Sequence, residues 1–214
     1  MKSVVSLLAT GFISVASSAL SQSGEIPFVT HNSYGAPGII EMPVAHSFPD
    51  ARLTFGYSHF TAENRNLINF QFHPRINLGF RYARVRDFKN DGDLYDRSFS
   101  LHLLLQDEGE FAPAVSLGVN DALGTGVSSS EYLVASKSLG DNLVISGGLG
   151  FGRLAGRPDF KNPLSIFDSL FEERPNIQNG QGGSVQTGQL FRGDGAFFGG
   201  IEWKPSSNLV LQAE

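Results

Sequence analysis

The sequence predicts an all-β fold, an antiparallel transmembrane β-barrel whose strands follow one another as a meander. About nine segments alternate between large apolar residues and polar or small ones, which is typical of strands with two different faces. The connections between these segments alternate between short and long ones. After residue 21, no apolar run reaches the about 18 residues that a spanning helix needs. A membrane-spanning sheet must close, because hydrocarbon leaves open backbone groups without partners.

The predicted strands share the alternation with period two. In chain order they are residues 53–58, 67–72, 77–83, 99–106, 114–119, 132–138, 143–152, 196–203 and 209–214. Aromatic residues recur near their ends and predict interfacial girdles. These residues are Tyr57, Phe60, Phe72, Tyr82, Phe99, Tyr132, Phe151 and Trp203.

The connections predict two different rims. The short ones are residues 73–75, 107–112, 139–142 and 204–208, and the long ones are residues 87–97, 120–131 and 153–195. The short link at residues 61–65 breaks the trend. Outer-membrane barrels place short turns in the periplasm and long loops outside. A soluble periplasmic β-sandwich that binds glycan is the alternative fold.

The sequence predicts that the chain is divided into three segments. Residues 1–21 combine an early Lys, an apolar run and small residues, as a cleaved secretory signal peptide does. Residues 22–50 contain four Pro and predict an irregular periplasmic lead segment. Residues 51–214 form the N-terminal part of the barrel, and we expect a longer protein because the chain stops inside a strand.

Composition and motifs argue against several kinds of activity. The net charge of -5 does not suit a nucleic-acid partner, and the absence of Cys removes thiol chemistry. The five His form no metal-binding motif and no G-x-S-x-G elbow occurs, so neither a metal nor another cofactor is expected and the protein is predicted not to be an enzyme. A barrel-embedded hydrolase or acyltransferase stays open as an alternative, with His59 or His102 near Ser58 or Ser100.

The stretch LVISGGLGFGRLAG, residues 143–156, contains the dinucleotide-binding pattern G-x-G-x-x-G/A after an apolar strand. That pattern requires a helix to follow, but Gly156 and Pro158 break the chain there. We therefore interpret Gly148, Gly150 and Gly152 as the inward positions of one barrel strand. Small residues there would leave room for a loop or a passing chain.

Other polar residues share the predicted inward phase. Asn69, Gln71, Arg81 and His102 are candidate contacts for the hydroxyl or carboxylate groups of a glycan. In the last long connection, residues 163–173 have apolar side chains at helical spacing. Either a short amphipathic helix folds into the barrel mouth there, or the segment is a mobile surface loop.

Several stretches resemble the YjbH-type exopolysaccharide family. Residues 35–45, GAPGIIEMPVA, resemble its opening signature, and Pro49-Asp50 follows as it does in the family. Residues 95–99, YDRSF, residues 123–126, LGTG, and residues 129–137, SSEYLVASK, are similar to further family motifs in the same order. A G-x-G-x-G-R-L strand comes next.

The resemblance implies an outer-membrane β-barrel of Gram-negative bacteria that assists exopolysaccharide or capsule production or export, as a conduit or scaffold. It implies polysaccharide, outer-membrane lipid and other secretion proteins as partners. Family members are much longer than this chain. Several are lipoproteins, but this trait is not transferred because the chain has no Cys that could be acylated. The family offers no catalytic residue to transfer.

Overall fold

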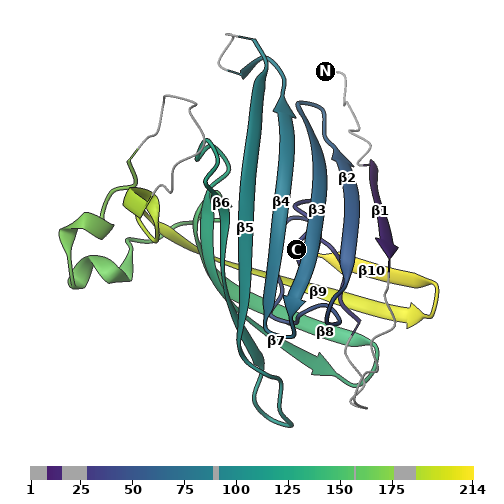
Figure 1. The fold of residues 1–214 in the computed structure, drawn as a ribbon. Helices are drawn as coiled ribbons and strands as arrows, with labels where there is room; N and C mark the ends of the chain where they lie inside the picture. The colour runs from purple at the N-terminus through teal and green to yellow at the C-terminus, as the bar shows by residue number, and fades with distance from the viewer. Residues whose placement is uncertain (1–8, 16–27, 89–91, 157, 176–186) are drawn as a thin grey trace, which may run out of the picture.

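The protein forms one long, curled antiparallel sheet (Figure 1). The computed structural model describes residues 9–15, 28–88, 92–156, 158–175 and 187–214. Ten strands pair strictly in chain order from β1 to β10. The first, β1, is Ala9–Val15, and β2 to β10 are Leu53–His59, Glu63–His73, Ile76–Val85, Leu94–Gln106, Ala114–Ala122, Ser130–Leu139, Leu143–Gly152, Gly195–Ser206 and Leu209–Ala213.

The nine predicted strands are confirmed as the meander from β2 to β10. An additional strand, β1, lies within the predicted signal peptide and pairs with the free edge of β2. The sheet is not closed, since β1 and β10 are its two edges. The role of residues 1–21 as a signal peptide stays a prediction.

The two faces of the sheet have inverted polarity compared with a water-soluble protein. The inner face, on the inside of the curl, buries mainly polar side chains. They include Thr54, Ser58, Arg65, Asn69, Gln71, Asn77, Arg81, Asp96, Ser98, His102, Ser116, Ser136, Ser146 and Glu202. The outer face exposes large apolar side chains. They include Phe55, Tyr57, Ile68, Phe70, Phe72, Leu78, Phe99, Leu101, Leu105, Leu133, Ile145, Phe197, Ile201, Trp203, Leu209 and Leu211.

The curl brings the two ends of the meander close together. In Figure 1, β2 to β5 stand side by side, and the later strands β8 to β10 run behind them. Thr30 hydrogen-bonds Glu202 of β9 and Gln212 of β10, whereas the next residue, His31, lies 3.2 Å from the hydroxyl of Thr54 in β2. Two consecutive residues before β2 therefore contact both ends of the meander.

The connections are shorter than the sequence predicted at two places. The predicted loop at residues 87–97 extends too far, because β5 already begins at Leu94. Asp96 lies in this strand and points inward, where it pairs with Arg81. The loop predicted at residues 120–131 is confined to residues 123–129 by β6 and β7. Charged and small residues at strand ends suggested loops there. The difference between the long-loop rim and the short-turn rim therefore rests mainly on residues 153–194.

The predicted amphipathic helix in that connection is also wrong. Pro163–Ile166 and Ser169–Phe171 are two short 3-10 helices, and neither buries a residue. Ile166 and Phe167 are 85% and 84% exposed, so the apolar residues of this segment do not fill the mouth of the curl. Among the described residues, no helix is long and apolar enough to cross a membrane.

The residues predicted to form aromatic girdles differ in their exposure, and the girdles themselves stay a prediction. Tyr57, Phe72, Phe99 and Trp203 are exposed on the outer face. Tyr132 is the main exception: it falls in the inward phase of β7 and is buried. Strand phase accounts for Tyr132. Phe151 has the outward phase of β8 and is buried because it packs against Phe191.

Candidate functional site

The described part of the predicted lead segment, residues 28–50, lies inside the curl, whereas residues 22–27 lie outside the described residues. This described part contains no strand. It bonds to the strands of the sheet near its start and again near Ala45. Near its start, the carbonyl of Ser33 accepts from Ser58 Oγ at 3.0 Å. Further along, Ala45 N donates to Ser136 Oγ at 2.8 Å and Ala45 O accepts from Ser116 Oγ at 2.6 Å. Strands from both halves of the sheet therefore hold this segment in place.

The glycine-rich start of the lead segment folds into a compact turn. Asn32 Oδ1 accepts from the amides of Tyr34 and Ala36, and Gly35 adopts a φ of +82°. A Cβ on Gly38 would lie 2.4 Å from the carbonyl oxygen of Met42, so only glycine fits there. Ile39 and Val44 are fully buried next to this turn. The turn presents Tyr34 to the inner face.

A cluster of paired charges surrounds Tyr34 near the long-loop rim. Glu63 accepts two hydrogen bonds of 2.8 Å from Arg65, and Arg81 lies 2.5 Å from Asp96. The Tyr34 ring lies 4.3 Å from the Arg65 guanidinium carbon and 5.5 Å from that of Arg81. Such buried ions are tolerated because each guanidinium is matched by a carboxylate and further hydrogen bonds.

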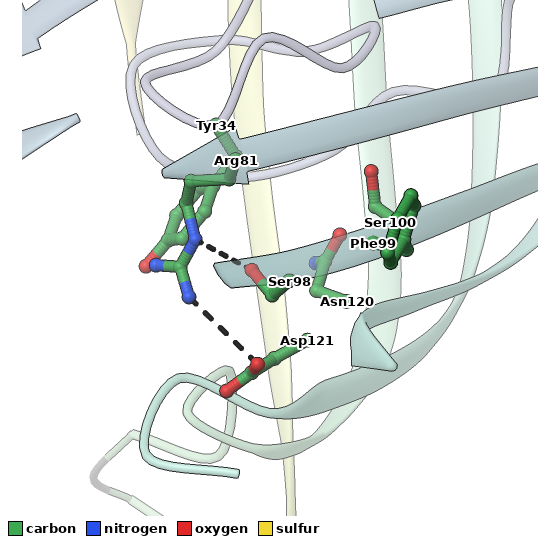
Figure 2. Close-up of a pocket in the computed structure, with 7 residues that line it drawn as sticks. All are labelled: Tyr34, Arg81, Ser98, Phe99, Ser100, Asn120 and Asp121. Carbon is green, nitrogen blue, oxygen red and sulfur yellow. Dashed lines mark hydrogen bonds and ion pairs between the residues drawn. The ribbon is translucent and has the colours of Figure 1, made fainter. Parts of the chain in front are cut away.

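Figure 2 shows the small pocket beside this cluster, lined in part by Tyr34, Arg81 and Asp121. Arg81 Nε donates to Ser98 Oγ at 2.9 Å, and its Nη2 lies 3.9 Å from Asp121 Oδ1. The volume accessible to water is about 10 Å³, which suffices for about one water molecule. This pocket cannot hold a sugar ring while the lead segment occupies the curl.

Asn69 and Gln71 lie on the inner face as predicted, and they form an amide ladder with Asn77. Asn69 and Asn77 exchange two hydrogen bonds of 2.7 Å, and Asn77 also donates to Gln71 at 2.9 Å. Arg81, a third candidate glycan contact, belongs to the charged cluster around Tyr34. The four polar candidate positions are therefore brought to one face, but each of them already bonds a protein group. Whether they contact a glycan stays a prediction.

His102 lies deeper in the curl, and its Nδ1 is 3.0 Å from the hydroxyl of Tyr132. Its Nε2 is buried without a hydrogen-bond partner among the described residues. Tyr132 crosses over Gly118, where a Cβ would lie 2.1 Å from the tyrosine ring. Gly118 therefore makes the His102–Tyr132 contact possible, and the alternation of the strands gives no sign of it.

Gly118→Ala should destabilise the fold by about 1–3 kcal/mol, since the added methyl group overpacks the Tyr132 ring. The control is Gly147→Ala, whose Cβ would make an ordinary contact of 3.7 Å with a carbonyl oxygen. Denaturant unfolding of both variants measures the difference. Equal stability of the two variants would contradict the assigned packing.

The inward glycines of β8 leave room for other parts of the protein, including residues of the connection that follows, as one of the two expectations had it. They leave no free space for a passing chain. A Cβ on Gly148 would lie 2.6 Å from the Phe198 ring, and one on Gly150 would lie 2.4 Å from Leu154. Gly152 has a φ of +63° and lies beside Arg174. A turn follows Gly152, whereas a dinucleotide-binding motif requires a helix at this place.

At the short-turn rim, His46 and Glu108 hold the other end of the lead segment. His46 Nε2 lies 2.7 Å from Glu108 Oε2, and Lys137 lies 3.0 Å from Glu108 Oε1. Burial lowers the pKa of His46 despite the carboxylate, so the neutral ring donates to Glu108. Burial would raise the pKa of Glu108, but hydrogen bonds from Lys137, Ser138 and His46 outweigh it and hold the pKa at about 2.

Acid should loosen the lead segment. Burial, aided by Arg52, lowers the pKa of His31 to about 3, and the pKa of His46 is lowered as well. Because the unfolded chain takes up these protons first, stability is lost as the pH falls below about 6.5. Glu108, whose pKa is lowered to about 2, adds a further loss below its ordinary value of 4.5.

Denaturation midpoints at about pH 7.5 and about pH 5 test this expectation, with a His31→Gln, His46→Gln variant as the control. The natural chain should lose stability between the two pH values. The double variant should lose less, because it carries no buried imidazole at these positions. An equal loss in both proteins would assign the pH dependence to other groups.

The long-loop rim is held to the wall by a second ionic contact that sequence reasoning missed. Arg174 donates to both carboxylate oxygens of Glu131, at 2.8 and 2.9 Å. The amide of Phe191 also donates to Glu131, at 2.9 Å. No signal in the sequence pointed to this contact, because Glu131 has the outward phase of β7 and its partner Arg174 lies in the long connection. Charges at these positions had instead suggested loop residues.

The geometry does not assemble a Ser–His pair. Ser58 Oγ donates to the lead segment, and His59 contacts Asn64. His102 contacts Tyr132, and no hydrogen bond among the described residues joins Ser100 to it. Nor do the described residues contain a group of three or more His, Cys, Asp or Glu that could hold a metal ion. What the inner face offers is a polar, hydrogen-bonding wall.

Comparisons with known proteins match the chain across this architecture. The family model described as "Exopolysaccharide biosynthesis protein YbjH" matches residues 30–214. The "Uncharacterized lipoprotein YjbH" of Escherichia coli (strain K12) is 31% identical over 194 residues. That alignment covers 86% of this chain and 28% of the relative, so the chain spans less than a third of the relative's length. No solved structure matches the chain.

The match to the family model begins in the lead segment and extends through β10. The match therefore includes both the lead segment and the strands β2 to β10 that surround it. The chain belongs to the YjbH exopolysaccharide biosynthesis family.

Proposed function

We propose that the chain is the N-terminal portion of an outer-membrane β-barrel protein that assists exopolysaccharide production or export, as a conduit or scaffold and without catalysis. The observation that carries this proposal is the inverted polarity of the sheet. In water, exposing large side chains such as Phe72 and Phe197 forgoes roughly 1.5–3 kcal/mol each relative to burial. In a bilayer the same face contacts lipid, and the polar face turns inward.

Further strands of a longer protein would close the barrel. The chain spans 28% of the length of its E. coli relative, so most of the counterpart lies beyond the matched region. Thr30 and His31 bring both ends of the meander within reach of one segment. Removal of a signal peptide that includes β1 would free the edge of β2 for pairing.

Membership of an exopolysaccharide biosynthesis family favours a polysaccharide context. The relative is called a lipoprotein, which favours the cell envelope, and we place this protein in the outer membrane of a Gram-negative bacterium. Hydroxyl and amide groups of the inner face suit a hydroxyl-rich polymer. The lead segment occupies these groups, so a conduit requires this segment to move, whereas a scaffold does not.

Membrane insertion is tested with the intact protein. A closed barrel should require detergent for solubility and should migrate differently in electrophoresis before and after boiling. A gene deletion should reduce surface polysaccharide, and the natural gene should restore it. A protein that stays soluble and monodisperse without detergent would overturn the barrel and favour a soluble β-sandwich.

The proposal also excludes a barrel-embedded hydrolase. His59→Ala and His102→Gln should leave polymer turnover unchanged, because neither His lies in a Ser–His pair. Heat-modifiable migration of each variant checks that its barrel is intact. Loss of turnover with an intact barrel would favour the enzyme.

A further inference from the structure

The connection between β8 and β9 carries an apolar knob, defined as Ile166, Phe167 and Leu170. All three side chains are exposed, by 85%, 84% and 57%. The knob lies on the two short 3-10 helices that project beyond the strands (Figure 1). Leaving such side chains in water costs free energy, so their exposure needs an explanation.

The knob is held outward by a rigid base. Asn162 is buried, and its amide donates to the carbonyls of Phe171 and Phe191 at 3.1 and 2.7 Å. Asp168 accepts from the amide of Leu170 at 2.9 Å and so caps the second short helix. These bonds fix the backbone on both sides of Phe167, which prevents the knob from collapsing onto the wall.

The base of the knob begins on the outer face of the sheet. Phe160 and Gly195 exchange two backbone hydrogen bonds, of 2.9 and 3.0 Å, at the start of β9. The Phe160 ring packs on Phe197, with ring centres 4.9 Å apart, and Phe197 is 78% exposed on the apolar outer face. The chain therefore leaves the wall from its apolar side, a few residues before the knob.

We propose that the knob inserts into the interfacial zone of the lipid bilayer at the long-loop rim and anchors this connection beside the barrel wall. The inference rests on the proposed membrane insertion and extends it to a segment outside the strands. Large apolar and aromatic side chains favour the interface, where their rings reach acyl chains and the backbone reaches headgroups. The outer face continues into the knob through Phe160 and Phe197.

The absence of natural Cys permits single labels at chosen positions. Phe167→Cys carries an environment-sensitive fluorophore in the intact protein, refolded into phosphatidylcholine vesicles with or without spin-labelled lipid. Glu173→Cys, an exposed polar position of the same connection, is the matched control. Phe197→Cys, on the outer face, reports on insertion of the wall itself. Ile166→Cys replaces Phe167→Cys if that variant does not refold.

We expect spin-labelled lipid to quench the labels at residues 167 and 197 and to leave the label at residue 173 bright. Quenching at 197 but not at 167 would overturn the anchor and leave the barrel in place. Quenching at neither 167 nor 197 would overturn the proposed insertion together with the anchor. Equal quenching at 167 and 173 would also overturn the anchor, since a loop lying near lipid without selective insertion gives that result.

Discussion

Asp96→Ala should destabilise the protein by about 3–5 kcal/mol, because it leaves the buried guanidinium of Arg81 without its closest carboxylate. The two side chains are only 3% and 6% exposed, so bulk solvent does not hydrate the guanidinium that is left without its partner. Asp96 also accepts from the amide of Thr125 at 3.0 Å, and its loss should loosen the loop between β6 and β7. Both effects act at the long-loop rim.

The single Trp, Trp203, reports unfolding by its fluorescence when the intact protein is titrated with denaturant in detergent. Asp93→Ala is the control, since it removes a carboxylate from the Arg84–Asp93 pair, whose Arg84 side chain is 48% exposed. The control should change stability little, as exposed ion pairs contribute little. If Asp96→Ala were as stable as Asp93→Ala, the cluster would not support the fold.

The sequence predicted the sheet well because alternation is a local property. Phe70 and Leu78, for example, point to the same face whatever the rest of the chain does, and both are exposed as their phase requires. The same phase correctly put Asn69, Gln71, Arg81 and His102 on the inner face. What alternation could not reveal was which protein groups would contact them.

The charged cluster was missed because charge near a predicted turn suggests a solvated loop. Glu63, Asp96 and Glu131 each stand at a strand end, and the structure shows each of them bonded to a buried or half-buried Arg. Strand phase places Glu63 and Asp96 inward and Glu131 outward. Their partners lie on β3 itself, on the neighbouring β4 and in the connection between β8 and β9. Such pairing depends on register, which local pattern does not determine.

The position of the lead segment could not be predicted for the same reason. Its Pro and Gly residues indicate the absence of a strand but not where an irregular chain lies. The contacts of Ser33 with Ser58 and of Ala45 with Ser136 join residues far apart in sequence. The closest signal was the dense GAPGIIEMPVA stretch, whose compact turn leaves Gly38 no space for a side chain.

Locking the lead segment to the wall should abolish polymer export if the barrel is a conduit. Ser33→Cys with Ser58→Cys joins the segment to β2, where the Ser58 hydroxyl lies 3.0 Å from the Ser33 carbonyl oxygen. The natural chain has no Cys, so a disulfide or a short bismaleimide link forms only at this pair. Each single-Cys variant is a control for the substitutions, and reduction of the disulfide should restore export.

The outcome separates the two roles that the architecture allows. While the segment is in place, the pocket beside Arg81 accommodates about one water molecule, so no polymer passes along this part of the inner face. A conduit must therefore release the segment, and the locked protein should lower surface polysaccharide to the level of the gene deletion. Normal export by fully cross-linked, correctly inserted protein would contradict the conduit. It would mean that the filled curl is the working state, in which the inner face stabilises a scaffold and its polar groups serve the lead segment alone.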